Sequence, residues 1–127
     1  MFNFQLGQSA TLKRTFTAAD LAAYATLTGA HQAASQQIVP GPLLGGMFSN
    51  LLGTTLPGRG TNYLKQRLEF PKPALLGQEL TARVEITRLR PEKFLVTLDT
   101  VCTNAAGEIV CRGAALVLVK DVELENS

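Results

Sequence analysis

The sequence predicts an α+β fold in which a curved antiparallel β-sheet wraps around one long α-helix. Only the segment from Pro42 to Thr54 has apolar residues at helical spacing over a length that could cover a sheet. Strand patterns follow it in the segments Asn62–Phe70, Glu79–Arg90, Phe94–Thr103 and Glu108–Val119. Because short turns separate these segments, we expect them to pair as antiparallel neighbours that bury one face against the helix.

The predicted helix begins with Pro42, whose fixed φ and missing N–H are harmless at a first helical position. Its apolar face is formed by Leu43, Leu44, Met47, Leu51 and Leu52. Gly45, Gly46 and Ser49 leave little side chain on another face, although a glycine costs a helix roughly 1 kcal/mol. The two adjacent glycines therefore predict that backbone approaches this face closely. The alternative is a loosely packed helix.

Ahead of this helix, Leu12–Phe16 is expected to form a short strand that leads into another helix. Thr17 and Asp20 have the spacing of a capping box, in which the Thr hydroxyl accepts from the backbone N–H of Asp20 and the carboxylate favours the positive helix end. Gly29 fits the left-handed position just past the end of that helix. Ala30–Gly41 has no usable period, so we expect a loop there.

The strand after the Pro57–Gly60 turn is expected to have two different faces. One face carries Leu64, Leu68 and Phe70, and the other carries Lys65, Arg67 and Glu69. The following strands supply further apolar faces, formed by Leu80, Ala82, Val84, Ile86, Phe94, Val96 and Leu98. Asn104–Gly107 is a good hairpin turn. The last strand, Glu108–Val119, is apolar on both faces, which is typical of a strand buried from both sides.

Length and charge exclude several classes of protein. At 127 residues we expect a single domain over 1–127, with Asp121–Ser127 as an acidic tail that frays. The 12 basic and 10 acidic residues give a net charge of +2 with no basic stripe, and Trp is absent, which argues against nucleic-acid binding. No run approaches the ~18 apolar residues of a membrane span, and the N-terminus has no signal-peptide pattern. We expect a soluble, cytoplasmic protein that does not bind membranes.

Cys102 and Cys111 flank the predicted hairpin turn on neighbouring apolar strands. They could face each other across the hairpin, but we interpret them as two reduced core thiols of a cytoplasmic protein. There is no CxxC pair and no Cys/His cluster, so we expect no metal site.

One motif connects the chain to a known family. The run that carries it is Leu56-Pro57-Gly58-Arg59-Gly60-Thr61-Asn62-Tyr63-Leu64-Lys65-Gln66. It resembles the Leu-Pro-Gly-x-Gly-Thr-x-Tyr-Leu-x-Gln run of the MaoC-like, (R)-specific enoyl-CoA hydratase family and matches it at every specified position. The resemblance covers most of the chain, roughly Phe16 to Val119, and implies a hotdog fold, the arrangement already predicted from the strand and helix patterns.

The chain departs from that family where the family performs catalysis. The family motif Ser-Gly-Asp-x-Asn-Pro-x-His supplies an acid and a base, and here Ala30 stands for the Asp and Ser35 for the His. The connection from Ser35 to Ile38 is also shorter than the family's, which usually carries a further helical turn. We therefore expect neither Ala30 nor Ser35 to be catalytic. His31, the only imidazole in the chain, is either a relocated base or an exposed loop histidine.

The resemblance also implies binding residues. The family turn His-Gly-Met becomes Pro40-Gly41-Pro42, and the backbone N–H of Gly41 can still polarise a thioester carbonyl, since this donor needs no side chain. Tyr63 either lines an acyl tunnel or packs within the sheet. Arg59, Lys65, Arg67 and Lys72 are candidate contacts for CoA phosphates, with a solvated strand face as the alternative. The resemblance implies no cofactor.

Three functions follow as hypotheses. The first is a MaoC-like homodimer that binds acyl thioesters of CoA or a carrier protein and has lost most or all hydratase activity. The second is a non-catalytic subunit that forms a heterodimer with an active MaoC-like paralogue. The third is a hotdog thioesterase, which would need a carboxylate or a polarised water at the helix start. None of the residues from Ala30 to Gly41 carries a carboxylate.

Overall fold

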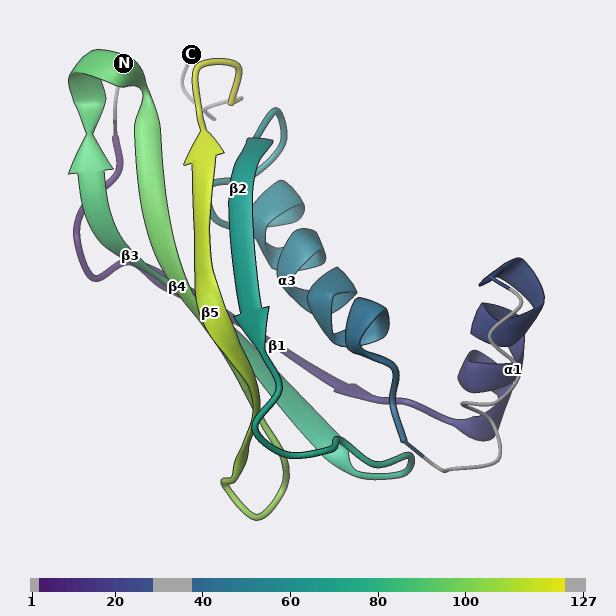
Figure 1. The fold of residues 1–127 in the computed structure, drawn as a ribbon. Coiled ribbons are helices and arrows are strands. Elements are labelled where there is room, and N and C mark those ends of the chain that lie inside the picture. The colour runs from purple at the N-terminus through teal and green to yellow at the C-terminus, as the bar shows by residue number, and fades with distance from the viewer. Residues whose placement is uncertain (1–2, 29–37, 123–127) are drawn as a thin grey trace.

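The computed structural model describes residues 3–28 and 38–122. In chain order its elements are β1 (Ser9–Thr15), α1 (Ala18–Thr28), α3 (Gly41–Thr54), β2 (Asn62–Glu69), β3 (Glu79–Arg90), the 3₁₀ turn η1 (Pro91–Lys93), β4 (Leu95–Thr103) and β5 (Ile109–Leu118). The strands form one antiparallel sheet in the order β1-β3-β4-β5-β2. α3 lies against one face of the curved sheet (Figure 1). The predicted α+β fold is confirmed.

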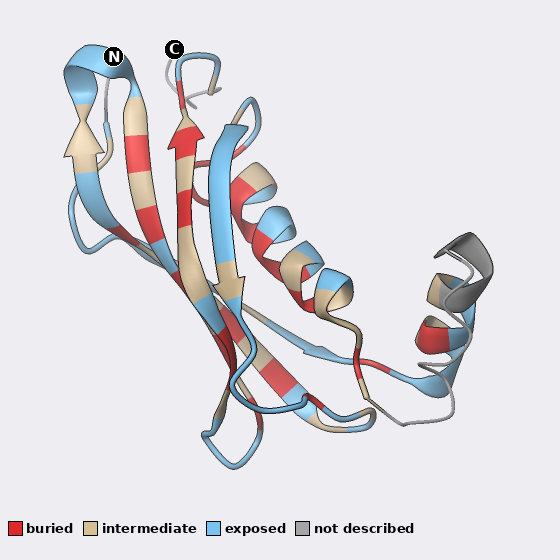
Figure 2. Ribbon diagram, in the orientation of Figure 1, coloured by how far each residue is buried: buried red, intermediate tan, exposed pale blue. Residues whose placement is uncertain are grey.

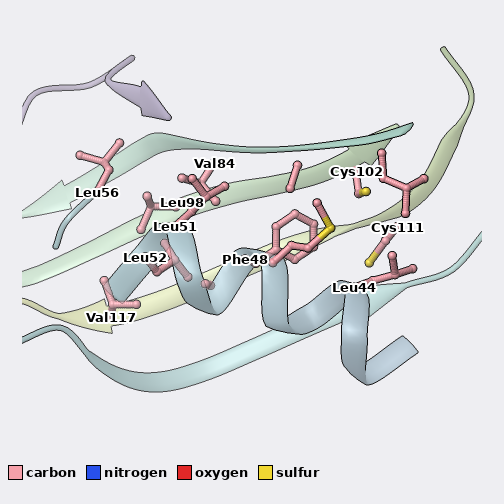
Figure 3. Close-up of a cluster of buried hydrophobic side chains, with 14 of the residues drawn as sticks. Leu44, Phe48, Leu51, Leu52, Leu56, Val84, Leu98, Cys102, Cys111 and Val117 are labelled. Carbon is pink, nitrogen blue, oxygen red and sulfur yellow. The ribbon is translucent and has the colours of Figure 1, made fainter. Parts of the chain in front are cut away.

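The core lies between α3 and the sheet face that it covers. From α3 the buried side chains are Leu44, Met47, Phe48, Leu51 and Leu52. Opposite them lie buried residues of β3, β4 and β5, including Val84, Leu98 and Val117 (Figures 2 and 3). Burying each of these side chains stabilises the fold by roughly 1.5–3 kcal/mol. The buried helix face differs from the predicted one, because it includes the fully buried Phe48 and because Leu43 is only half-buried.

The predicted capping box at the start of α1 is confirmed. The backbone N–H of Asp20 donates to Oγ1 of Thr17 over 3.2 Å, and the backbone N–H of Thr17 donates to Oδ2 of Asp20 over 2.9 Å. The bond from the Thr17 backbone lowers the pKa of the Asp20 carboxyl, since it favours the ionised form. Two N–H groups of the first turn therefore have partners.

The prediction that Leu64 shares the inner face of β2 with Leu68 was wrong. The register shifts between Tyr63, which pairs with Val117, and Lys65, which pairs with Leu116. Because of this bulge, Tyr63 rather than Leu64 faces α3, and its hydroxyl donates to Oγ of Ser49 over 3.1 Å. Leu64 is 54% exposed.

Two other strand predictions were wrong. Phe94 precedes β4 in a left-handed conformation (φ 55°) and is exposed, so it does not share the buried face of Val96 and Leu98. β5 is buried on one face only: Arg112 is exposed and Leu116 is half-buried on the face that no helix covers. An antiparallel sheet with one helix layer has one such uncovered face, so apolar composition on both sides did not indicate burial of both.

Cys102 and Cys111 pair directly across β4 and β5 as free, fully buried thiols, as predicted. Burial raises the pKa of Cys102 to about 11 and that of Cys111 to about 12. Both are therefore protonated and unreactive at neutral pH. Residues 123–127 of the predicted tail lie outside the described residues. Within the described ranges, none of the helices has the length and apolar character needed to span a membrane.

Candidate functional site

The N-terminal end of α3 presents one backbone donor. Pro40 precedes the helix, and Gly41 is its first residue. Pro42 has no N–H, while the N–H groups of Leu43 and Leu44 both donate to the carbonyl of Pro40, over 3.0 and 3.4 Å. Gly41 is thus the position in this first turn whose N–H has no acceptor within the helix, and it lies at the positive end of the helix dipole.

A cavity of about 600 Å³ lies on one side of Gly41, between the residues that lead into α3 and the connection that follows β2. The segments are 38–41 and 70–74. They are held together by the bond from the N–H of Val39 to the carbonyl of Ala74, over 2.8 Å, and by the bridge between Ile38 and Leu75. The lining residues are Ile38, Val39, Pro40, Gly41, Leu44, Phe70, Lys72, Pro73 and Ala74. The cavity is therefore mainly apolar.

A second cavity, of about 480 Å³, lies between α3 and β2. It is lined by Gly41, Pro42, Gly45, Gly46, Ser49, Gln66, Leu68 and Phe70. Among the residues that the structure describes, a Cβ added at Gly45 would contact only Cδ1 of Leu68, at 3.5 Å, and one at Gly46 would meet none within 4 Å. The prediction that backbone packs against these glycines was wrong. Their missing side chains leave room for the cavity instead.

Gly41 and Phe70 line both cavities, which together we call the α3 groove. A Cβ added at Gly41 would lie 3.0 Å from Cζ and 3.2 Å from Cε1 of the Phe70 ring. Few real Cβ contacts are that close, so a larger residue at 41 requires the ring to move. The Phe70 ring therefore packs close to Gly41, at the place that the two cavities share.

Tyr63 and Ser49 bridge β2 and α3 beside the second cavity through the hydrogen bond between their hydroxyls. Burial raises the pKa of the Tyr63 phenol. Tyr63 is therefore a neutral donor at physiological pH and not a base. Ser49 lines the second cavity, which places this pair at the end of the groove farther along α3 from Gly41.

The candidate phosphate contacts lie in different places. Lys65 and Arg67 are exposed and alternate along β2 with Gln66, which lines the groove, so they lie on the outer face of the sheet. Arg59 is exposed in the loop between α3 and β2. Lys72 lines the first cavity beside Gly41. Among these cations the structure brings only Lys72 to the groove, and phosphate contacts by all four stay predictions.

The positions of the family's acid and base, Ala30 and Ser35, lie outside the described residues, as does His31. The described residues that line the groove include no Asp, Glu or His. The roles assigned to these three residues therefore stay predictions.

The sequence patterns missed several groove residues. Gln66 shares strand parity with Leu68 and Phe70, so the period of two could have identified it. Nothing local marks Pro73 and Ala74, which reach the cavity because they pack beside the segment that leads into α3.

The fold and the groove at the start of its central helix define a hotdog protein of the MaoC-like class. No family model matches the chain. Curated relatives do: the chain is 39% identical to the (R)-specific enoyl-CoA hydratase of Aeromonas caviae, covering 91% of this chain and 95% of that protein. It is 38% identical to the (R)-specific enoyl-CoA hydratase of Rhodospirillum rubrum, covering 89% and 86%. The chain belongs to the (R)-specific enoyl-CoA hydratase family.

Solved structures agree with this assignment. The (R)-hydratase of A. caviae superimposes with a TM-score of 0.82 at 40% identity, covering 90% of this chain and 96% of that one. The unliganded R-hydratase of Pseudomonas aeruginosa gives a TM-score of 0.84 at 32% identity, covering 95% and 84%. A complex of two different chains from Mycobacterium tuberculosis, ChsH1–ChsH2, gives 0.74 at 16% identity over 90% of this chain and 97% of that one, which shows the fold alone.

Proposed function

We propose that this chain binds an acyl thioester of CoA or a carrier protein in the α3 groove, and that its hydratase activity is lost or much reduced. One observation carries the proposal. Gly41, whose N–H has no acceptor within α3, lines a groove formed mainly by apolar residues, while the described lining residues include no Asp, Glu or His. The relatives named as enoyl-CoA hydratases support the substrate class.

The groove can hold each part of such a substrate. The thioester carbonyl would accept from the Gly41 N–H at the positive end of α3, which polarises the carbonyl without any side chain. The acyl chain would extend over Gly45 and Gly46 toward the hydroxyls of Ser49 and Tyr63. Apolar walls favour an acyl chain because burial removes its surface from water.

Binding and polarising the thioester carbonyl are not sufficient for hydration of an enoyl thioester, which also needs a base and an acid. A base must take a proton from water as the oxygen attacks C3, and an acid must deliver a proton to C2. Ala30 offers no ionisable group, and Ser35 has no basic site near neutral pH. His31 as a relocated base is the one candidate that the sequence leaves for this step.

We expect Gly41→Ala to weaken thioester binding about tenfold. The new Cβ would press on the Phe70 ring and narrow the groove, a strain of order 1–3 kcal/mol that falls partly on the ligand. Isothermal titration with butyryl-CoA, a saturated thioester that cannot be hydrated, measures the change. Gly53→Ala is the matched control, because its Cβ meets nothing within 4 Å and Gly53 lines neither cavity. Absence of binding to the wild-type protein would contradict the proposal.

We also expect a homodimer. β2 is an edge strand with exposed apolar side chains, Tyr63 and Leu64, and Phe70 follows it. Pairing with the β2 edge of a second copy would satisfy its free backbone groups and cover these side chains. Light scattering at micromolar concentration should therefore give the mass of two chains, and a monomer would contradict this assembly.

A heterodimer is the second candidate, since a chain without the acid and base could support an active MaoC-like partner. One chain of the ChsH1–ChsH2 complex has this fold, so a chain of this fold assembles with a differently named chain in another protein. Co-expression with an active paralogue, followed by light scattering, distinguishes the two assemblies. A thioesterase is less well supported, because the described groove residues include no carboxylate.

A further inference from the structure

Lys72 is the only charged side chain among the described residues that line the α3 groove. It lies in the connection between β2 and β3, and its Nζ forms an ion pair with Oε2 of Glu108 at the start of β5. We propose, resting on the thioester function above, that Lys72 selects an anionic thioester by exchanging Glu108 for an anionic oxygen of the ligand. That oxygen belongs to a phosphate of the carrier, because the acyl chain is placed in the second cavity whereas Lys72 lines the first.

Hydrogen bonds hold the Glu108 carboxylate in place as the partner of Lys72. The side-chain NH₂ of Asn104 donates to Oε1 of Glu108 over 3.1 Å, which leaves Oε2 for Lys72. Oδ1 of Asn104 accepts from the backbone N–H groups of Ala106 and Glu108, each over 3.0 Å, so the hairpin turn is rigid. Bonds from Lys72 and Asn104 lower the pKa of Glu108, which is therefore ionised at neutral pH.

Lys72 is the mobile member of the pair. Its ammonium ends a flexible four-carbon stem, and its side chain is 56% exposed. An exposed ion pair contributes little to stability, so replacing one anion by another costs the protein little. Glu108 thus acts as a built-in competitor: a neutral ligand leaves the pair intact, whereas an anionic ligand with an oxygen near the groove displaces Glu108.

The other cations near this end of the sheet do not have this arrangement. Arg112 pairs with Glu69 at 3.6 Å on the outer face, and Arg14 pairs with Asp20 at 3.6 Å. Neither residue lines the α3 groove. Within residues 3–28 and 38–122, Lys72 alone combines a place in the groove wall with a partner that can be exchanged.

The test compares two variants with opposite expected effects. Lys72→Met should weaken the binding of an anionic thioester about tenfold, because the cation is lost. Glu108→Gln should strengthen it severalfold, because the competing carboxylate is lost while the bond to Asn104 remains possible. Titrations use butyryl-CoA, butyryl-pantetheine, which has the same arm without phosphates, and glutaryl-pantetheine, which carries a carboxylate on the acyl chain.

The three ligands identify the source of the anion. If a carrier phosphate is bound, both variants change the affinity for butyryl-CoA and neither changes it for the two pantetheine thioesters. If only glutaryl-pantetheine responds, Lys72 binds an acyl carboxylate, the acyl chain lies in the first cavity, and the proposal of a carrier phosphate is wrong. Lys13→Met and Glu79→Gln are matched controls, because Lys13 and Glu79 form an exposed pair at 3.9 Å between β1 and β3, away from the groove. They should leave all three affinities unchanged.

Two results would overturn the proposal in different ways. If wild-type protein binds these thioesters but Lys72→Met and Glu108→Gln leave every affinity unchanged, or change neutral and anionic ligands equally, Lys72 does not select an anion and the thioester function stands. If wild-type protein binds none of the three ligands, the thioester function fails and the role of Lys72 fails with it.

Discussion

Purified wild-type protein should hydrate crotonyl-CoA at least about 10⁴-fold more slowly than the (R)-specific enoyl-CoA hydratase of A. caviae. General acid and base groups each contribute about 10²–10⁴-fold, and by the resemblance Ala30 and Ser35 stand where the family has its acid and base. The Gly41 donor and the positioning of the substrate could sustain a trace, since residual catalysis commonly outlasts the loss of side chains. Loss of the crotonyl absorbance over time measures the rate, and bound butyryl-CoA confirms that the groove is intact in the same sample.

Two sets of variants test which residues are responsible for any hydratase activity that remains. If His31 is a relocated base, His31→Ala abolishes the trace, and the wild-type pH profile has a limb near 6–7, where an imidazole loses its proton. Rapid turnover that survives His31→Ala would refute both the proposal that hydratase activity is lost or much reduced and the hypothesis that His31 is a relocated base. The double variant Ala30→Asp with Ser35→His should restore little or nothing, because the shortened connection after Ser35 lacks the segment that would hold the new imidazole. A large gain would show that only the two side chains were missing.

Gly113→Ala should destabilise the protein by about 3 kcal/mol, the upper end of the usual cost of inserting a methyl group into a packed region. A Cβ at Gly113 would lie 1.8 Å from the carbonyl oxygen of Arg67 and 2.8 Å from its carbon. Because these atoms belong to the β2 backbone, the strand itself must move away from β5. Such a loss is a large fraction of a typical total stability of 5–15 kcal/mol.

Urea denaturation followed by circular dichroism measures this change. The control is Gly46→Ala in α3, where the added Cβ meets nothing within 4 Å and removal of a helical glycine should stabilise by about 0.5–1 kcal/mol. The two glycine replacements thus have opposite expected signs. If Gly113→Ala and wild type unfold at the same urea concentration, β2 does not approach β5 as closely as it does in the structure.

The close contact at Gly113 also bears on the groove. Gly113 pairs with Leu68, and Leu68 lines the second cavity opposite Gly45. A displaced β2 would therefore change the width of the groove together with the stability. The glycines at 45, 46 and 113 act differently: the first two leave space for the cavity, and the third lets the strand that forms the cavity wall come close to its neighbour.

Local patterns alone determined most of the elements of this protein. The period of two located β3 from Glu79 to Arg90, and the helical spacing with Pro42 located α3 to within one residue at its start. The capping box of Thr17 and Asp20 was also readable, because its partners are three residues apart. Each of these features depends on the conformation of one short segment, so the order of residues in that segment is sufficient information.

Only the tertiary structure decided which side chains form and flank the α3 groove. The bulge after Tyr63 turns this side chain toward Ser49, the glycine face of α3 opens onto a cavity, and Lys72 enters the groove wall opposite Glu108. Each of these arrangements joins segments that are far apart in the chain. Because a contact of this kind depends on how two elements pack, the pattern within either element alone does not specify it.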